Sequence, residues 1–218
     1  MHSIAAIVFL IACAASAQSR ATAATEAGPL IWEPPTINIA KQLPPAASPK
    51  PIITMLRIGR IDISLEDTEL SAAEKSLGAK VGRRGDASQY VAWLCFHGKD
   101  SNGRFALWLE SSEIAGGVID GFAVRRIPST ATPDRRCRVL QPDETVMTAP
   151  IQVHLGMTKA QVLKVMGQPT AIDGNILIFE HEHNETIRGE PFTADNTVYA
   201  QLDNGIAARI QVWKDTTD

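Results

Sequence analysis

The densest group of potential metal ligands is a short run of alternating acids and histidines, Glu180 to Glu185. If this run is an extended strand, His181 and His183 project from one face and Glu180 and Glu182 from the other, because side chains alternate along a strand. Two histidines on one face could bind zinc or copper if a third ligand lay nearby. However, the HExxH motif is absent and spacing nominates no third ligand. We therefore expect a solvated strand edge and no metal or cofactor, with His181 and His183 as weak candidates.

Nucleophilic chemistry has little support. Ser111 and Ser112 lie outside the G-x-S-x-G pattern, and spacing places no serine next to a base. Cys95 and His97 would face the same side of a strand, as a thiol–imidazole pair requires. Because Cys95 lies in an apolar run, burial or a disulfide is the preferred interpretation. We therefore expect no catalytic residues and a protein that is not an enzyme.

The first 17 residues predict export from the cytoplasm. The apolar run from Ile4 to Ala12 has the length of a signal-peptide core and is too short to span a bilayer. Small residues up to Ala17 predict cleavage after that position. Alternatively, Leu10 to Cys13 resembles a lipobox, in which Cys13 would carry the lipid. Both routes place the mature chain in the periplasm or outside the cell, or on an outer-membrane lipid anchor, with no transmembrane segment.

Two cysteines remain after such processing. In an oxidising compartment they suggest one disulfide, between Cys95 and Cys137, and two separate buried thiols are the alternative. The two cysteines are far apart in the sequence and have no histidine partners at ligand spacing. They therefore make a poor zinc site on sequence grounds.

The mature chain divides into a tether and two similar units. Residues 18–51 are rich in Ala, Pro and Thr, as in a mobile tether, with 30–32 as a candidate docking element. Ile61 to Gly78 and Ile151 to Gly167 then share an apolar-x-apolar-x-Leu-x-x-Thr pattern that ends in glycine. Such a repeat indicates duplicated units. We expect the first unit at 52–140 and the second at 141–218.

Each unit reads as a short helix followed by an antiparallel meander. Thr68 and Thr158 are expected N-caps, while Gly78 and Gly167 can end the helices in a left-handed conformation. Asn204-Gly205 between apolar runs predicts a hairpin. The predicted fold class is α+β, with helices packed on small antiparallel sheets. The expected strands are 90–96, 104–109, 118–127, 176–179, 198–202 and 206–213.

Charge excludes one class of partner and suggests another. The chain has 218 residues and a formal net charge of −3, so it lacks the basic excess of a nucleic-acid-binding protein. The first unit is nevertheless basic and the second acidic. A basic surface could meet an acidic protein or anionic lipid, and incidental charge on folded faces is the alternative. Its candidate residues are Arg83, Arg84, Arg125, Arg126, Arg135 and Arg136.

One motif in the second unit resembles a known family. Leu-Gly-Met-Thr at 155–158, then Val162, and Gly-x-Pro-Thr at 167–170 resemble the BamE-like (SmpA/OmlA) envelope family. The resemblance implies a small α+β fold with two short helices and a three-stranded antiparallel sheet, without catalytic residues. The family's namesake is an outer-membrane lipoprotein of the β-barrel assembly machinery. The motif residues, which we interpret as structural, are Leu155, Gly156, Met157, Thr158, Val162, Gly167 and Pro169.

Three functional hypotheses follow. The favoured one is an exported, non-enzymatic envelope protein that binds another protein, in outer-membrane or envelope assembly or maintenance. The second is a secreted or periplasmic inhibitor of a hydrolase, because the tandem arrangement resembles β-lactamase inhibitory protein. The third is a small periplasmic enzyme or metal chaperone that uses His181 and His183.

Overall fold

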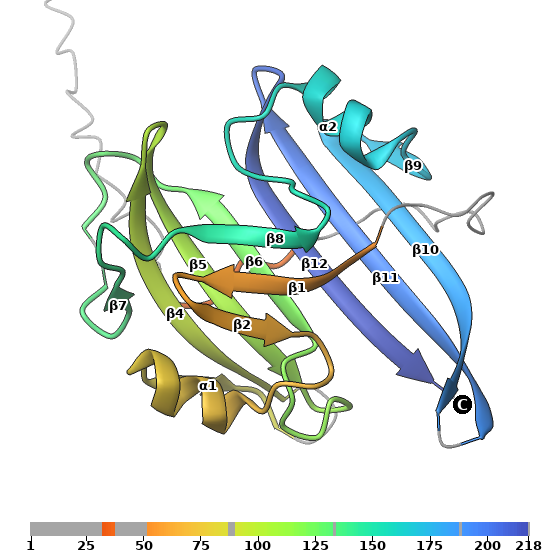
Figure 1. The fold of residues 1–218 in the computed structure, drawn as a ribbon. Helices are drawn as coiled ribbons and strands as arrows, with labels where there is room; N and C mark the ends of the chain where they lie inside the picture. The colour runs from red at the N-terminus through yellow and green to blue at the C-terminus, as the bar shows by residue number, and fades with distance from the viewer. Residues whose placement is uncertain (1–31, 38–51, 87–89, 133, 188, 218) are drawn as a thin grey trace, which may run out of the picture.

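The structure, a computed structural model, describes residues 32–37, 52–86, 90–132, 134–187 and 189–217. The signal-peptide and lipobox predictions, Cys13 included, and most of the predicted tether lie outside these residues. The described chain forms one large and one small β-sheet with two short helices (Figure 1). No helix in the described part of the chain is long and apolar enough to cross a membrane.

The large sheet has nine strands, and neighbours along its main path are antiparallel. The added strand β7 (Arg138–Val139) pairs with β4 in parallel. Along the path the order is β3 (Val81–Arg84), β4 (Val91–Asp100), β5 (Gly103–Ser112), β6 (Gly121–Arg126), β12 (Ile206–Thr217), β11 (Glu190–Asp203), β10 (Ile176–Ile187) and β9 (Ala171–Asp173).

The two halves of the large sheet have matching topology. Helix α1 (Leu70–Leu77) is followed by β3 to β6, and helix α2 (Lys159–Met166) by β9 to β12. The last strand of each series, β6 or β12, lies at the centre, and the first lies at an outer edge. Both helices contribute to one apolar core on the same side of the sheet. The arrangement has the order expected of two copies joined about a two-fold axis.

The predicted α+β fold class is wrong. Strands make up 54% of the structure and helices 10%, and the strands form large antiparallel sheets rather than two small ones. The reason is the pairing of β6 with β12, where Arg125 lies opposite Arg209 and Gly121 opposite Trp213. A lone β6 would leave a row of unpaired backbone groups, and β12 satisfies them. The helices, at eight residues each, cover only part of the resulting surface.

The small sheet lies in front of the large one and has the order β2 (Ile61–Ser64), β1 (Ile53–Ile58), β8 (Val146–Pro150) (Figure 1). Strand β8 follows the expected unit boundary at residue 140 but pairs with β1 of the first unit. Asn196 of β11 ties this sheet to the large one: its side chain accepts from the Ile53 amide and donates to the Ile53 carbonyl. The main core lies between the two sheets and the helices.

The helix ends test the capping predictions. Thr158 caps α2 with a reciprocal pair of bonds to Gln161, so this prediction is confirmed. The helix ends at Gly167 as predicted, but with φ 76° and ψ −157° this residue lies outside the left-handed helical region. Gly78 ends α1 in the left-handed conformation, also as predicted. The N-cap prediction for Thr68 is wrong, because Glu69 occupies that position. The Thr68 hydroxyl instead accepts from the Ser64 amide and so closes the preceding turn.

Candidate functional site

The side of the large sheet turned away from β1, β2 and β8, here called the rear face, carries the candidate site. Strand alternation determines which residues reach it. In β11, Val198 and Ala200 are buried in the core. Thr197, Tyr199 and Gln201, which alternate with them along the strand, are partly exposed on the rear. The two halves of this face differ: one is covered by other parts of the chain, and no described segment covers the other, here called the open half.

The first half of the rear face is an apolar cluster separate from the main core. Its centre is the pair Trp93 and Trp108, both almost fully buried. Gly82 is needed beside them, because a Cβ there would overlap the rings of Trp93 and Trp32. The members of the cluster are Trp93, Cys95, Ala106, Trp108, Ala123, Ile127 and Cys137.

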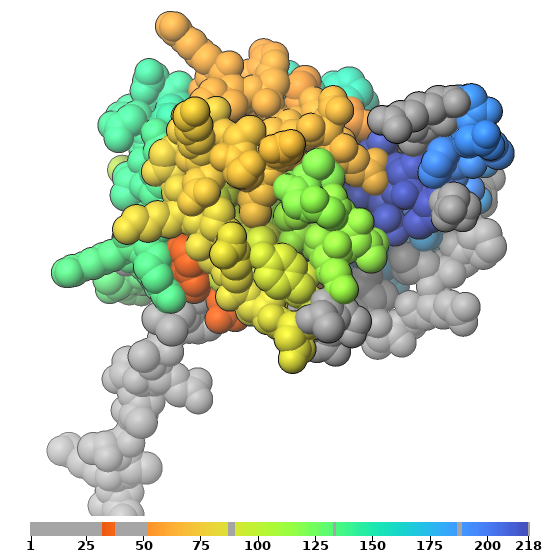
Figure 2. Space-filling view, turned by 90° about the horizontal axis from the view of Figure 1, so that it is seen from below, coloured from red at the N-terminus to blue at the C-terminus, as the bar shows by residue number. Residues whose placement is uncertain are grey.

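Trp32 covers this cluster from the rear. Its ring meets Trp93 edge to face at 5.7 Å, and its carbonyl accepts from Trp108 Nε1 at 3.1 Å. Figure 2 shows the short segment 32–37 on the side of the large sheet opposite β1 and β2. Pro34 in it is buried. The predicted docking element thus makes contact through Trp32, while residues 30 and 31 lie outside the described part.

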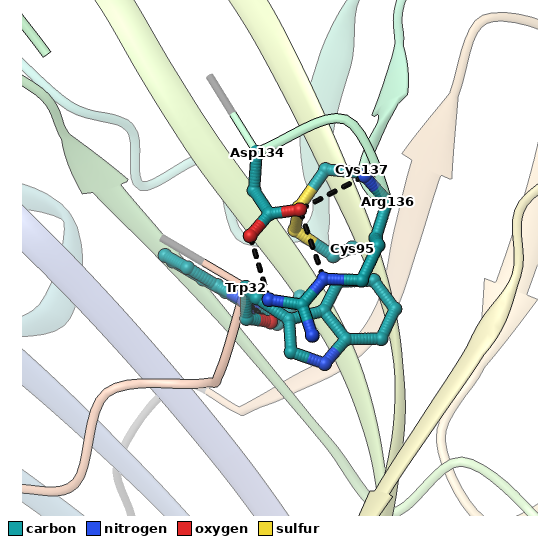
Figure 3. The surroundings of a disulfide bond; sticks show 6 residues. Trp32, Cys95, Asp134, Arg136 and Cys137 are labelled. Carbon is teal, nitrogen blue, oxygen red and sulfur yellow. Dashed lines mark hydrogen bonds and ion pairs between the residues drawn. A yellow bond between two sulfur atoms is a disulfide. The ribbon is translucent and has the colours of Figure 1, made fainter. Parts of the chain in front are cut away.

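A disulfide fixes the loop that flanks Trp32. Cys95 of β4 is bonded to Cys137, with a Cα–Cα distance of 4.6 Å, within the usual range for such bonds (Figure 3). In the same loop, Arg136 pairs with Asp134 and places its guanidinium 4.5 Å from the centre of the Trp32 ring. The pKa of Asp134 falls to about 2, chiefly through the hydrogen bond from Arg136. Disulfide, ion pair and indole therefore form one connected cover.

Reduction of the oxidised protein is expected to raise its intact mass by two hydrogen atoms and to lower the free energy of unfolding by about 2–4 kcal/mol, because the bond constrains the unfolded chain. Cys95 and Cys137 are 42 positions apart, so the closed loop is long. Peptide mass mapping with a thiol-alkylating reagent checks the pairing. Labelling of either cysteine before reduction would contradict it.

The six candidate arginines do not form one basic surface. Arg84 pairs with Glu33, and Arg136 and Arg125 lie over Trp32 and Trp108. The remaining three, Arg83, Arg126 and Arg135, lie elsewhere. Arg83 alternates with Arg84 on β3, Arg126 pairs with Asp100, and Arg135 is exposed on the loop. The rear face therefore holds three of them, and each contacts an aromatic ring or an acid rather than an open partner surface.

The open half of the rear face is formed by β10, β11 and β12. Tyr199 and Trp213 lie at its centre, and the Trp213 ring lies over Gly121, where a Cβ would overlap it. Cross-strand register places Thr197 between Glu180 and Trp213, and Asp195 between Glu182 and Asp215. Aromatic side chains and carboxylates therefore share one partly exposed surface. Such amphipathic rings with polar neighbours are typical of protein-binding surfaces.

The carboxylates of this half repel one another. Burial and the charge of Glu182 raise the pKa of Asp195. Burial, then Asp195 and Glu182, raise the pKa of Glu180, and Glu180 in turn adds to the effect of burial in raising the pKa of Tyr199. At the opposite end of the face, burial and the neighbouring Arg125 lower the pKa of Arg209. The rear face thus has an acidic end that favours an approaching cation.

A buried pair of acids lies where the covered and open halves meet. Glu110 of β5 lies opposite Gly121 of β6 and is almost completely inaccessible. Burial, with repulsion from Asp120, raises the pKa of Glu110 to about 8. Burial also raises the pKa of Asp120 to about 6, although Ser112 donates to it from both its amide and its hydroxyl. These acids stabilise or destabilise the fold according to pH and are not accessible to a substrate.

The histidine run does not form a metal site in the described residues. His181 and His183 share the face that continues the front core, and their rings stack with centroids 4.9 Å apart. His183 Nε2 lies 2.8 Å from Glu185, whose carboxylate also lies 3.5 Å from Lys214. Among the residues that the structure describes, no third ligand lies close enough to the two rings to complete a site there. The face-sharing predicted for these histidines is confirmed, and their neighbourhood is an ion-pair network.

A cavity of about 440 Å³ lies on the front side between the β4–β5 hairpin, β8 and residues 153–155. Its walls combine apolar residues, such as Leu56 and Phe105, with polar ones, such as Lys99 and His154. Its two acids are already paired: Asp100 binds Arg126 through two bonds, and Glu144 binds Arg138. Neither carboxylate is therefore left without a cationic partner that a ligand would have to supply.

The residues of the family-like motif have structural positions. Leu155, Met157 and Val162 are buried in the main core, and Gly156 adopts a positive φ of 90° beside Asn102. No family model matches the chain, and no curated protein or solved structure shows significant similarity to it. The motif thus explains local packing around α2 and identifies no functional group.

Sequence reasoning missed most of the rear face. It named the docking of Trp32 and the cysteine pair, and it weighed His97 only as a thiol–imidazole partner of Cys95. It gave no role to Tyr199, Trp213 or Glu110. A signal for the first two exists: aromatic residues at the polar positions of an alternating strand indicate a surface used for contact. No local signal of this kind predicts that Glu110 lies opposite Trp93 on the neighbouring strand.

Proposed function

We propose that the chain is an exported, non-enzymatic envelope protein that binds a protein partner through the open half of the rear face. The observation that carries the proposal is the combination of Tyr199 and Trp213 with a row of mutually repelling carboxylates on a partly exposed sheet surface. A sheet face with this composition is suited to a partner that brings both apolar contact and positive charge.

Charge complementarity identifies the partner's chemistry. Glu182, Asp195 and Asp215 occupy one cross-strand row. Burial, and then repulsion by neighbouring carboxylates, raises the pKa of Asp195 and of Asp215. A Lys- or Arg-bearing protein segment laid across this row would relieve the repulsion. The partner is therefore a protein with an exposed basic segment rather than an anionic lipid.

The predicted export signal supports an envelope location, and the disulfide supports an oxidising compartment. The resemblance to BamE-like proteins adds a role in outer-membrane or envelope assembly or maintenance. The cover over the first half, with Trp32, directs binding to the second half, because the apolar cluster beneath it is already buried.

Site-specific photocrosslinking in the native host tests the proposal. A photoreactive amino acid in place of Tyr199 is expected to give one discrete protein adduct. The matched control carries the same probe in place of Ile114, which is 75% exposed on the turn after β5, and is expected to give none. Equal adducts at both positions, or none at Tyr199, would reject the rear face as the binding surface.

A charge variant tests the role of the acids. Replacing Glu182 by Gln and Asp195 by Asn is expected to reduce the adduct at Tyr199 about three- to tenfold, because removed rim charges slow association. With the acids intact, the adduct at the Tyr199 probe should also decrease from pH 7.5 to pH 5, because the raised pKa of Asp195 and of Glu180 makes these two carboxylates lose charge at a higher pH than an ordinary carboxylate. Asp67→Asn, on an exposed loop in front, is the control. If the captured partner is a hydrolase that the protein inhibits, the inhibitor hypothesis is selected.

A further inference from the structure

Two cysteine sulfurs, bonded to each other, and one imidazole meet on the rear side of β4. Cys95 and His97 project from the same face of this strand, two residues apart. Cys137 is brought to them from 42 positions away, because β7 pairs in parallel with β4 and sets Arg138 beside Phe96 and Val139 beside His97. The sulfur atoms and a His97 ring nitrogen all lie within 4.8 Å of one another.

His97 is an unexplained buried polar group. It is only 5% exposed, and neither of its ring nitrogens has a hydrogen-bond partner among the described residues. A buried unsatisfied polar group costs about 1–3 kcal/mol, so proteins rarely retain one without a purpose. A bound metal ion satisfies an imidazole nitrogen that has no hydrogen-bond partner.

The surroundings favour the ligand form of the imidazole. Burial, with Arg104 adding to it and Asp134 opposing it, lowers the pKa of His97 and so favours the neutral ring, which has a lone pair to donate. The Arg104 guanidinium is itself held by bonds to the carbonyls of Ser129 and Ala131.

We propose that, once the Cys95–Cys137 disulfide is reduced, the two thiolates and the His97 imidazole bind one Zn²⁺ ion. Tetrahedral zinc holds sulfur at about 2.3 Å and nitrogen at about 2.0–2.1 Å, which places its ligand atoms about 3.5–3.8 Å apart. The three ligand atoms already lie within 4.8 Å of one another. Side-chain rotation alone therefore brings them into that arrangement. The loop before β7 then stays attached to β4 in both redox states.

The electrons and protons of this exchange balance. A dithiol reductant transfers two electrons and two protons to the Cys95–Cys137 bond, breaks it into two thiols, and becomes a disulfide itself. Zinc binding then displaces both thiol protons, forms two Zn–S bonds and one Zn–N bond, and leaves the fourth position to solvent. Reoxidation would release the ion.

Titration of the full mature chain with Co²⁺, a spectroscopic substitute for zinc, tests the site. The reduced protein is expected to bind one Co²⁺ per chain, with thiolate-to-cobalt charge-transfer absorption and tetrahedral d–d bands. The oxidised protein is expected to show neither. Identical spectra in the two redox states, or no bands after reduction, would overturn the proposal.

A variant separates the imidazole from the thiols. His97→Gln retains both cysteines and is expected to weaken cobalt binding about tenfold or more, since one of three ligands is lost. Its near-ultraviolet circular dichroism in the oxidised state controls for folding, and His154→Gln, which removes a histidine outside the cluster, is the matched control. Unchanged affinity in a folded His97→Gln variant would refute the role of His97.

A measurement on the unmodified chain covers the case in which His97→Gln does not fold. X-ray absorption of the reduced, zinc-loaded protein is expected to show two sulfur ligands at about 2.3 Å and nitrogen at about 2.0 Å. Four sulfur ligands would indicate an ion shared between two chains, and absence of nitrogen would exclude His97. Either result overturns the site as proposed.

Discussion

Glu110→Gln is expected to raise the free energy of unfolding by about 3–5 kcal/mol above pH 8 and to change it little near pH 4. The carboxyl is wholly buried, and burial together with Asp120 raises its pKa from 4.5 to about 8. Glutamine has nearly the same shape and cannot ionise. The variant therefore removes the cost of a buried charge without opening a cavity.

The sign follows from proton binding in the two states. Between pH 4.5 and about 8 the folded protein keeps the Glu110 proton, whereas the unfolded chain has lost it. The stabilisation is complete below the pKa of the unfolded chain and is lost as the pH rises through the pKa of the folded state. Asp120, whose pKa is raised to about 6, adds a smaller loss in a lower window.

Urea unfolding at several pH values checks this expectation. The unmodified protein should lose stability steadily from pH 5 to pH 8, and Glu110→Gln should show a flatter profile. Glu113→Gln is the matched control, because Glu113 is exposed three residues along the chain. If Glu110→Gln and the unmodified protein differ in stability by the same amount at every pH, Glu110 does not titrate as described.

Asn196→Leu is expected to lower the free energy of unfolding by about 3–6 kcal/mol, because it leaves two or three buried backbone groups without their partner. The Asn196 side chain accepts from the Ile53 amide at 3.0 Å and donates to the carbonyls of Ile53 and Trp213 at 2.9 and 3.1 Å. Leucine fills a similar volume, so the loss measures the polar contacts rather than a cavity.

The expected loss is specific to this link between the two sheets. Asn184→Leu, at an exposed position of β10, is the control and should change stability by no more than about 0.5 kcal/mol. Urea unfolding measures both variants. Equal effects of the two substitutions would mean that Asn196 does not hold β1 to the large sheet.

Local patterns predicted the elements better than their assembly. The strand predicted at 104–109 lies within β5 and that at 206–213 within β12, because period-two apolar patterns and the Asn204-Gly205 turn act over short distances. Thr158 and Gly167 were predictable for the same reason. The pairing of β6 with β12 joins segments about 90 residues apart, and no local residue choice specifies it.

The candidate site depends on the same distant contacts. Trp32 belongs to a proline-rich stretch that read as a tether, yet it completes a cluster built on β4 and β5. Cys137 reaches His97 only because β7 adds to β4. Sequence spacing argued against a zinc site at the cysteines, because it compares only positions along the chain. The pairing of β7 with β4 brings the two cysteines together in space.

The central position of β12 has a consequence for how the protein acquires its shape. Residues 206–217 are the last that the structure describes, and they lie between the two halves of the large sheet. A chain that emerges with its N-terminus first therefore presents β6 with one unpaired edge until those residues arrive. The first half must wait for the second, so chain emergence and sheet closure are ordered in time, and a chaperone that shields this edge during the interval would protect the chain from aggregation.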